Sequence, residues 1–270
     1  VLAMQTKEVM EGDTDDVIAE LLALNGSSAG ARPKALIGVD KERKNISFGV
    51  HQLSDGFEHW MVKFPNSQDG KDSGAIEYVY ALMATEAGIT MPNVHLFSSQ
   101  KGNGYFAVKR FDREGNKRLH MHTVSGLIHS NFRFPSLDYE DLLSLTSYLT
   151  KDIREVEKMF RLAVFNVMAH NQDDHAKNFS FLMNELGEWK LSPAYDLTFS
   201  NGPGGEQSTM VLGEGRNITL QHLLKLGTEA QLSKKFIESV INQTRSAIGK
   251  WTDLAKYYGV SDSNINFINR

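Results

Sequence analysis

Residues 170–178 read HNQDDHAKN and residues 191–196 read LSPAYD, and these two stretches decide the fold. Asp173 could accept a proton from an attacking hydroxyl, while Asn178 and Asp196 offer the hard oxygen ligands that magnesium prefers. Protein kinases carry a catalytic Asp, an Asn shortly after it and a metal-binding Asp further along the chain. The same order and spacing here predicts phosphoryl transfer of the kinase type.

Length and composition set the limits within which this interpretation must fit. The chain has 270 residues, 41% of them hydrophobic, a net charge of −4 and no cysteine. A substantial core and two lobes are therefore expected, in a reducing compartment, with the cytoplasm as the default location. No apolar run reaches the roughly 18 residues of a membrane helix, so we expect no membrane contact. The negative charge favours DNA association only through a partner. Because the chain begins with Val, we also expect an N-terminal portion to be trimmed or encoded elsewhere.

The first part of the chain has the element order of a kinase N-lobe. A helix is predicted over 13–24 and a loop of small residues over 26–34. Short strands, separated by polar turns, should follow, and a small sheet should form from them. The predicted strands are 35–39, 46–51, 59–64, 94–98 and 105–111, with a helix over 76–87 between the third and fourth.

From about residue 137 the pattern becomes helical. Helices are predicted over 139–149 and 155–169, and again through most of 220–254. Between them, 178–183 and 188–192 form a hairpin that turns at 184–187 and brings Asn178 and Asp196 to one end. The predicted class is α+β, a two-lobed protein-kinase-like fold with a small mixed N-lobe sheet and a mainly helical C-lobe. We place the N-lobe at 1–113 and the C-lobe at 114–270.

Lys63 is a lone lysine among apolar residues at the end of a predicted strand. In a kinase, the lysine at this place contacts nucleotide phosphates and pairs with a glutamate of the following helix, a role for which Glu77 is placed. A lysine whose stem lies along a sheet edge is the ordinary alternative. The Asp173, Asn178 and Asp196 set favours the kinase interpretation.

The loop over 26–34 could place backbone N–H groups against phosphates, with Arg32 and Lys34 adding positive charge. It matches neither the Walker A pattern nor G-x-G-x-x-G. Phosphorylation of Ser27 or Ser28 would place negative charge where nucleotide phosphates should sit. We therefore expect such phosphorylation to inhibit.

The strand over 105–111 ends where kinases bind adenine through the main chain. Lys109 and Phe111 would serve by backbone groups, and Asp112 could take a ribose hydroxyl. A charged strand exit is the simple alternative. We also expect His175, Lys177 and Tyr195, which lie within the stretches 170–178 and 191–196, to contact the nucleotide.

Together these motifs resemble the HipA family of bacterial Ser/Thr kinase toxins, the toxin half of HipBA toxin–antitoxin pairs. The resemblance rests on GSSAGARPKA at 26–35, VKFP at 62–65, RFDR at 110–113, DDHAKN at 173–178 and SPAYDL at 192–197. It implies Asp173 as catalytic base, Asn178 and Asp196 as magnesium ligands, Lys63 on the ATP phosphates and Lys109 and Phe111 at the adenine. It also implies Ser27 as the inhibitory autophosphorylation site, with Ser28 as the fallback.

The resemblance further implies a biological role. Family members phosphorylate aminoacyl-tRNA synthetases, and a HipB-like helix-turn-helix antitoxin neutralises them and links them to DNA. A full HipA also has a small N-terminal subdomain that this sequence does not show; if a separate chain supplies that subdomain, the resemblance is to the split HipT form.

Two rival functions stay open from the sequence. Asp173, Asp174 and His175 could bind a metal ion in a phosphoesterase, which would not need Lys63. Alternatively, the chain is a catalytically silent module that binds an antitoxin.

Overall fold

The computed structural model describes most of the chain as two compact units. Described residues are 5–8, 32–48, 52–65, 70–100, 102–129 and 137–269, with the backbone alone for 5–8 and Pro203. Unit 1 comprises Val1–Val79, Pro92–Arg118 and Thr252–Arg270, and unit 2 comprises Tyr80–Met91 and Leu119–Trp251. The helix predicted over 13–24, and Ser27 and Ser28 in the following loop, lie outside the described residues.

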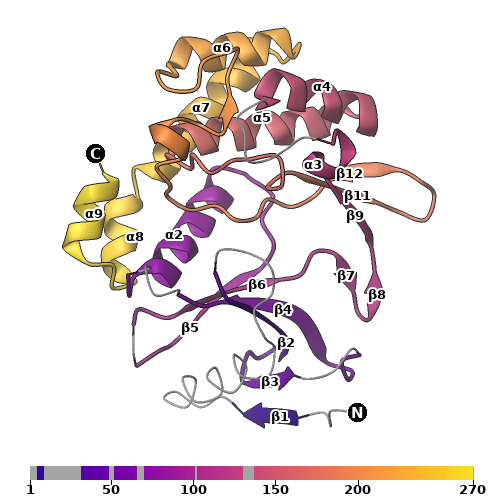
Figure 1. Ribbon diagram of the computed structural model, residues 1–270, viewed down its shortest axis with the longest axis vertical. Helices are drawn as coiled ribbons and strands as arrows, with labels where there is room; N and C mark the ends of the chain where they lie inside the picture. Colours follow the sequence, from indigo (N-terminus) through magenta and orange to yellow (C-terminus); the bar gives the residue numbers. More distant parts are fainter. Residues whose placement is uncertain are drawn as a thin grey trace. The chain divides into compact units, whose positions relative to one another are not determined.

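Unit 1 is built on a six-stranded sheet with the strand order β1-β3-β2-β4-β6-β5 (Figure 1). The strands are β1 (Gln5–Glu8), β2 (Lys34–Asp40), β3 (Asn45–Phe48), β4 (Phe57–Lys63), β5 (Val94–Phe97) and β6 (Tyr105–Lys109). We expected a mixed sheet, but every described pairing in it is antiparallel. Short connections such as 41–44 reverse the chain between neighbouring strands, which favours antiparallel pairing.

The core of unit 1 follows the two-residue period of its strands. In β2, Ala35 and Ile37 are 1% and 3% exposed, while Leu36 between them is 52% exposed. Trp60 and Val62 of β4 join the same buried cluster. Alternate residues of a strand point to opposite faces, so Lys63, which follows Val62, points to the face of the sheet opposite this cluster.

Helix α2 (Ser73–Glu86) carries Glu77, and its start is fixed within unit 1. The buried carboxylate of Asp72, just before the helix, accepts hydrogen bonds from Asn103 Nδ2 at 2.5 Å, Ser261 N at 2.9 Å and Asn264 Nδ2 at 2.7 Å. Ser261 lies between helices α8 (Trp251–Tyr257) and α9 (Asp262–Ile268). Asp72 therefore joins the helix start, the β5–β6 turn and the C-terminal helices.

Unit 2 contains a three-stranded sheet of order β12-β11-β9. Its strands are β9 (His120–Thr123), β11 (Ser180–Met183) and β12 (Trp189–Leu191), and β11 pairs antiparallel with both neighbours. The β11–β12 turn is closed by Asn184 Oδ1, which accepts from Leu186 N at 3.0 Å and Glu188 N at 2.9 Å. The predicted hairpin is confirmed, with Asn178 before its first strand and Asp196 after its second.

The helices of unit 2 begin at polar caps. Asp138 caps α4 (Tyr139–Thr150), Asp152 caps α5 (Ile153–Met168) and Ser233 caps α7 (Lys234–Ile248), while Thr219 and His222 form a capping box at α6 (Leu220–Glu229). Such caps satisfy amide groups left open at a helix start. Met159, Phe160, Ala163, Val164 and Phe165 of α5 are fully buried, so this helix forms the centre of the core of unit 2.

The predicted strands and helices within the described residues are confirmed, with ends that shift by a few residues. Several short elements were not predicted. They are β1, β7 (Arg113–Glu114), β8 (Lys117–Arg118), β9, α3 (Val124–Leu127), β10 (Leu137–Asp138), β13 (Thr209–Met210), the 3₁₀ turn η1 (Pro203–Gly205) and the seven-residue helix α9. Most of these elements have only two to four residues, too few to show a periodic pattern, and β9, β10 and β13 also pair with strands distant in the sequence.

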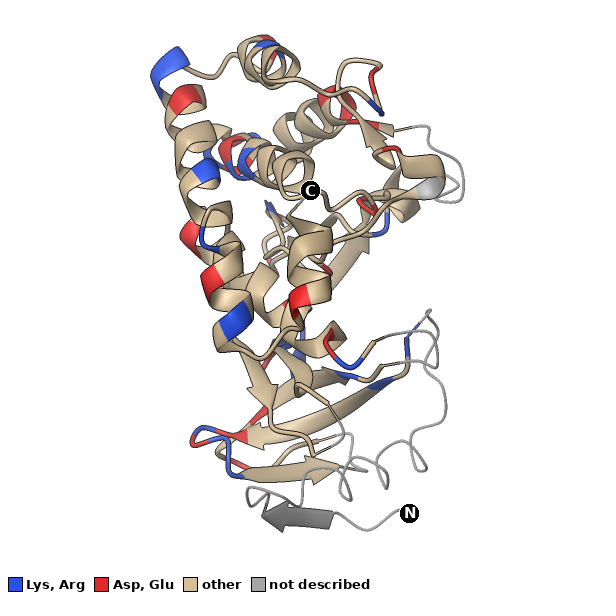
Figure 2. Ribbon diagram, turned by 90° about the vertical axis from the view of Figure 1, so that its left-hand side faces the viewer, with Lys and Arg blue, Asp and Glu red and all other residues tan. Residues whose placement is uncertain are grey.

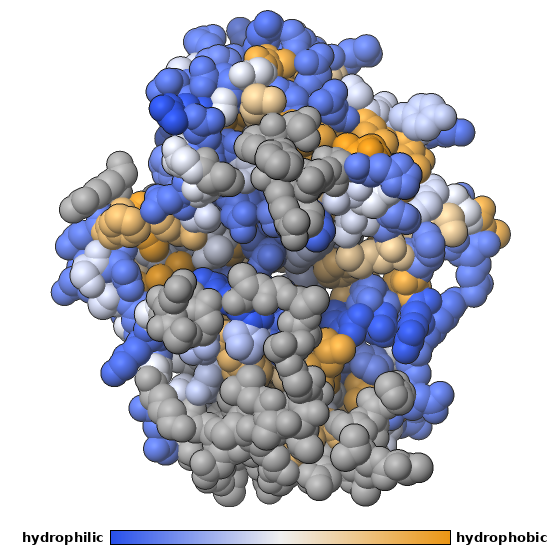
Figure 3. Space-filling model, viewed as in Figure 1, coloured by the Kyte–Doolittle hydropathy of each residue, from blue (hydrophilic) through white to orange (hydrophobic). Residues whose placement is uncertain are grey.

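The surface of the described residues is mixed in charge and mostly polar. Figure 2 shows Lys and Arg interspersed with Asp and Glu along the helices. Figure 3 shows hydrophobic residues on the visible face in small, separate groups. None of the helices in the described ranges is both long enough and apolar enough to cross a membrane.

Candidate active site

Unit 2 holds the loop over 170–178, which follows α5 and carries the predicted base. Two backbone hydrogen bonds join it to Ser200, whose N–H donates to His170 O at 3.0 Å and whose carbonyl accepts from Gln172 N at 3.3 Å. A third backbone hydrogen bond joins the loop to a later segment, where Ser208 N donates to Gln172 O at 3.0 Å. The loop thus lies between two later segments of the chain, both within unit 2.

Asp173 presents its carboxylate to solvent, with 58% of its side chain exposed. Its carbonyl accepts a hydrogen bond from Asn178 Nδ2 at 2.7 Å, and its Oδ1 lies 3.9 Å from His175 Nε2. Partial burial raises the pKa of Asp173, His175 lowers it and the neighbouring Asp196 carboxylate raises it. The structure therefore brings Asp173, His175, Asn178 and Asp196 together in unit 2.

Asp196 and Asn178 have the donor chemistry of a magnesium site. Because Asn178 Nδ2 donates to Asp173 O, its Oδ1 is the amide atom left to ligate a cation. Asp196 is exposed and has a φ of 60°, a left-handed conformation that Asp adopts more readily than most residues. Strained backbone of this kind concentrates at functional sites. Two hard oxygen donors fit Mg²⁺, which keeps several of its waters in such sites.

Tyr195 links the segments that carry Asn178 and Asp196. Its hydroxyl donates to Lys177 O at 2.6 Å and lies 2.5 Å from Ser180 Oγ. Burial raises the pKa of Tyr195 to about 12, so the phenol stays protonated. Tyr195 precedes Asp196 and Lys177 precedes Asn178, so this contact fixes the spacing of the two candidate ligands. We predicted that Tyr195 contacts the nucleotide, but its hydroxyl makes hydrogen bonds within the protein.

Next to Asp173, the side chain of Asp174 points inward and is fully buried. Its Oδ2 accepts from Tyr139 Oη at 2.5 Å and Gln207 Nε2 at 2.9 Å, and its Oδ1 accepts from Thr209 N at 3.0 Å. Burial outweighs these donors and raises the pKa of Asp174 to about 6.

Further hydrogen bonds extend this cluster. Asn166 Nδ2 donates to Tyr139 Oη at 3.0 Å, Asn171 Nδ2 donates to Asn166 Oδ1 at 3.0 Å, and Gln207 Nε2 donates to Asn171 O at 2.8 Å. We call the set the Asp174 network; its members are Tyr139, Asn166, Asn171, Asp174, Gln207 and Thr209.

The sequence did not lead us to predict the partners of Asp174. Asn166 carried the clearest signal, as an amide inside the apolar helix α5, where it is 2% exposed. A buried amide calls for a hydrogen-bond partner. The identity of that partner depends on the tertiary fold.

In unit 1, Lys63 of β4 forms a buried ion pair with Glu77 of α2. The side chains are 7% and 3% exposed, and Arg32 NH1 lies 3.7 Å from the other Glu77 oxygen. Lys63 Nζ also lies 5.7 Å from the centre of the Phe106 ring. A buried ion pair is expensive to desolvate, which makes a purely structural role a poor explanation. Lys34 stands directly opposite Lys63 in the β2–β4 register.

The residues predicted to contact adenine and ribose lie at the end of β6 and directly after it. The N–H of Lys109 donates to Asn93 O at 2.8 Å. A main-chain contact from Lys109 to an adenine would therefore use the carbonyl of Lys109. Its side chain pairs with Glu58 at 2.5 Å. The Asp112 carboxylate, which we predicted at a ribose hydroxyl, accepts from Arg110 NH2 at 2.7 Å and Arg113 NH1 at 2.6 Å. Phe111 is partly buried beside them.

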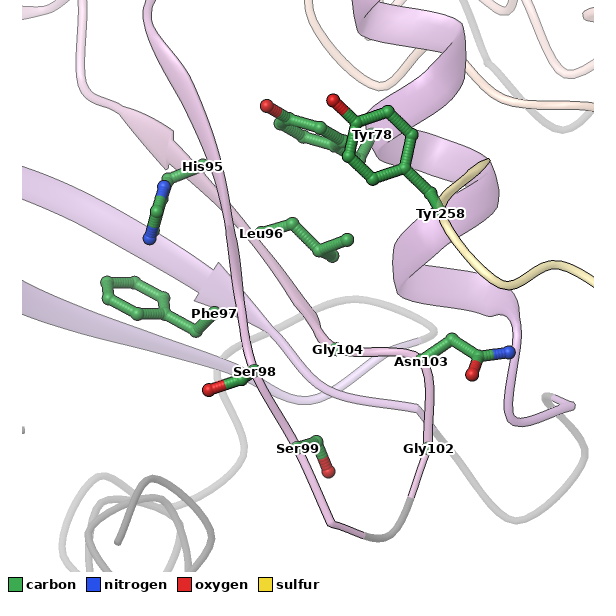
Figure 4. A pocket seen from close by; sticks show the side chains of 10 residues that line it. All are labelled: Tyr78, His95, Leu96, Phe97, Ser98, Ser99, Gly102, Asn103, Gly104 and Tyr258. Carbon is green, nitrogen blue, oxygen red and sulfur yellow. The ribbon is translucent and has the colours of Figure 1, made fainter. Parts of the chain in front are cut away.

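A separate cavity of about 440 Å³ lies in unit 1. It is lined by Tyr78, Tyr258, the strand β5 and the β5–β6 turn, and none of the predicted site residues lines it. Figure 4 shows Leu96 and the two tyrosines on one side of β5, and His95 and Phe97 on the other.

The α+β fold, with a Lys–Glu pair in one unit and an Asp–Asn–Asp set in the other, is that of a protein-kinase-like protein. The profile of the HipA-like C-terminal domain family matches residues 26–252. The chain therefore belongs to the HipA-like C-terminal domain family.

Two relatives from Sinorhizobium fredii are named as candidate kinases. Y4dM is 24% identical over 205 residues, which cover 68% of this chain and 49% of Y4dM. Y4mE is 25% identical over 121 residues, which cover 42% of this chain and 29% of Y4mE. The chain thus spans half or less of the length of these relatives.

A solved structure has the same fold. The HipA structure from Shewanella oneidensis MR-1, in complex with HipB and operator DNA, matches with a TM-score of 0.67 and 17% identity. The match covers 98% of this chain and 69% of that one.

Glu77→Gln should lower the free energy of unfolding by about 3 kcal/mol, because it leaves the buried Lys63 ammonium without the opposing charge of a carboxylate. Urea unfolding at pH 7 measures this change. The matched control is Glu58→Gln, which removes the partly exposed partner of Lys109 and should cost less than about 1 kcal/mol. Equal effects of the two variants would contradict the buried pair.

Asp174→Asn should remove a pH dependence of stability. A pKa raised to about 6 from 3.8 stabilises the wild-type fold most below pH 4, and this contribution is lost as pH rises through 6. The unfolding free energy of wild type minus variant should fall between pH 4 and 7 by on the order of 2–3 kcal/mol.

Asp72→Asn is the control for this pH series. Burial raises the pKa of Asp72, but hydrogen bonds from Ser261, Asn264 and Asn103 lower it below 3.8 overall. Its contribution is complete above pH 4 and is lost only at lower pH. The difference from wild type should therefore be constant between pH 5 and 7. A constant difference for Asp174→Asn as well would contradict the raised pKa.

Proposed function

We propose that the protein is an ATP- and Mg²⁺-dependent Ser/Thr protein kinase. The observation that carries the proposal is the buried Lys63–Glu77 pair, since a phosphate-binding lysine held by a glutamate is a working part of kinases. The Asp173–Asn178 hydrogen bond supports it from the other unit. The assignment of a kinase N-lobe to 1–113 and a C-lobe to 114–270 is part of this proposal.

In the proposed reaction, Asp173 accepts the proton of the acceptor hydroxyl. The hydroxyl oxygen forms a bond to the γ-phosphorus while the bond from that phosphorus to its bridging oxygen breaks, and ADP leaves. Lys63 and Lys34 offer positive charge to phosphate oxygens, and the backbone of Lys109 and Phe111 offers polar groups to the adenine. His175 and Lys177 add further polar groups beside the base.

Asn178 and Asp196 would hold Mg²⁺ in this reaction. The bound ion would neutralise charge on the phosphate oxygens. Asp173, in contrast, does not become covalently attached to the phosphoryl group, so its contribution is position and proton acceptance.

The phosphoesterase alternative fits the geometry less well. It needs the Asp174 carboxylate at a metal ion beside Asp173, but Asp174 is buried and accepts hydrogen bonds from Tyr139, Gln207 and Thr209. Within the described ranges, no group of three or more His, Cys, Asp or Glu side chains is arranged to hold a metal. The catalytically silent binding module remains the second candidate, since an intact set of residues can belong to an inhibited enzyme.

The family membership supports a biological role. We propose that the protein is the toxin of a HipBA-type pair in the cytoplasm and that a HipB-like helix-turn-helix antitoxin binds it and provides any contact with DNA. We further propose an aminoacyl-tRNA synthetase as the protein substrate and Ser27, or Ser28, as an inhibitory autophosphorylation site.

Variants of Lys63 and Asp173 should separate these functions. Lys63→Met should weaken ATP binding at least about tenfold, because the phosphates lose a charge partner. Asp173→Asn should keep ATP binding but lower turnover by about 10²- to 10⁴-fold, because the acceptor proton has no base. Isothermal titration with ATP and Mg²⁺ measures affinity, and a coupled ADP assay measures turnover.

The control is Asp141→Asn, an exposed carboxylate of α4 outside the site, which should match wild type in both assays. Hydrolysis of phosphate esters with unchanged ATP affinity in Lys63→Met would favour the phosphoesterase. ATP binding without turnover in the unphosphorylated wild type would favour the silent module.

A further inference from the structure

Asp173 and Asp174 are consecutive acids with opposite environments. Asp173 is exposed, whereas Asp174 is fully buried and surrounded by donors from distant parts of the chain. Removing a carboxylate from water costs free energy that hydrogen bonds recover only in part, as the raised pKa of Asp174 reflects. The carboxylate is the acceptor that Tyr139, Gln207 and Thr209 share, so the burial of Asp174 fixes these three donors around the loop.

The Asp174 network holds the backbone of the loop over 170–178 on both sides of Asp173. At one end, Gln207 Nε2 donates to the carbonyl of Asn171 at 2.8 Å. At the other, the Asp174 carbonyl accepts from Thr209 Oγ1 at 2.5 Å, while Thr209 N donates to the carboxylate of the same residue. Asp173 lies between these two fixed points, so its backbone has little freedom to rotate.

The partners come from three well-packed elements of unit 2. Tyr139 is the first residue of α4, Asn166 lies in the apolar helix α5, and Thr209 belongs to β13, which pairs with β10 directly before α4. Tyr139 and Thr209 are fully buried, and the Tyr139 ring also packs edge-on against Phe179 at 5.9 Å. The donors are therefore rigid, and each fixes the position of the loop relative to the core.

We propose that the Asp174 network positions Asp173 for proton acceptance, with Asp174, Tyr139 and Gln207 as positioning residues. The inference rests on the proposed kinase function, since it assigns to these residues a share in that reaction. They contact neither nucleotide nor acceptor. They act through the backbone on either side of Asp173, so their loss should lower the turnover number and leave ATP affinity unchanged.

Two substitutions test the network. Asp174→Asn keeps the shape of the side chain but replaces an acceptor with a donor that faces other donors. Tyr139→Phe removes a single hydroxyl from the same site and preserves the buried ring, so it serves even where Asp174→Asn fails to fold. The matched control is Thr146→Val, which removes an equally buried hydroxyl that bonds Leu142 O at 2.7 Å within the same helix.

The measurements are kcat and KM for ATP, together with hydrogen exchange of the amides in 171–178. Tyr139→Phe and Asp174→Asn should lower kcat about 10- to 100-fold, since small displacements of a catalytic group are costly, with KM for ATP changed less than about twofold. Amide exchange in 171–178 should be faster in both. Thr146→Val should match wild type in kcat and in exchange, even where it lowers the melting temperature.

Failure of this inference differs from failure of the proposed function. Wild-type protein without phosphoryl transfer contradicts the function itself. Wild-type transfer, with kcat and loop exchange in folded Tyr139→Phe equal to those of Thr146→Val, would overturn the positioning role. A rise in KM for ATP at unchanged kcat would overturn it as well, because that pattern belongs to a nucleotide-binding residue.

Discussion

The carboxylate of Asp174 is removed from water, and hydrogen bonds that offset the cost of this burial fix the conformation of the loop over 170–178. Tyr139 of helix α4 supplies one donor, and Gln207 and Thr209 of the segment around β13 supply the other two. The hydrogen bonds to this one buried carboxylate therefore form only when helix α4, the loop and the segment around β13 pack together in a single arrangement. Asp173 is exposed as a consequence, because adjacent residues of this fixed loop point in opposite directions.

A second buried charge organises unit 1 in the same way. Lys63 and Glu77 lie on a strand and on the helix that follows it, and their meeting requires that α2 pack on the sheet at one rotation about its axis. The hydrogen bonds of Asp72 fix the start of that helix against the β5–β6 turn and the C-terminal helices. Each unit taken by itself buries an ionisable group among or next to its candidate functional residues at a cost in stability, which is a common feature of functional sites.

Residues with roles in local motifs could be predicted from sequence, and residues with roles in distant contacts could not. The β11–β12 hairpin was predictable because Asn184 and Gly187 have strong turn preferences and Asn178 and Asp196 flank its strands. Lys63 stood out because a charge among apolar strand residues needs a partner, and Glu77 was the acid available on the next helix. The partners of Asp174 were not predictable, since Tyr139 precedes it by 35 residues and Thr209 follows it by 35. The pairing of Asp112 with Arg110 and Arg113 was missed although it is local, because neighbouring charges at a partly buried strand end have several arrangements of similar energy.

The central claim is that this member of the HipA-like C-terminal domain family transfers the γ-phosphoryl group of ATP to protein. The direct measurement is incubation of the wild-type protein with ATP carrying a radiolabelled γ-phosphate, Mg²⁺ and the soluble proteins of a bacterial lysate, followed by detection of label on protein. The account predicts acid-stable label on serine or threonine, either on the chain itself or on a lysate protein, and none without the chain. Absence of such label from protein that starts unphosphorylated and binds ATP would contradict the account.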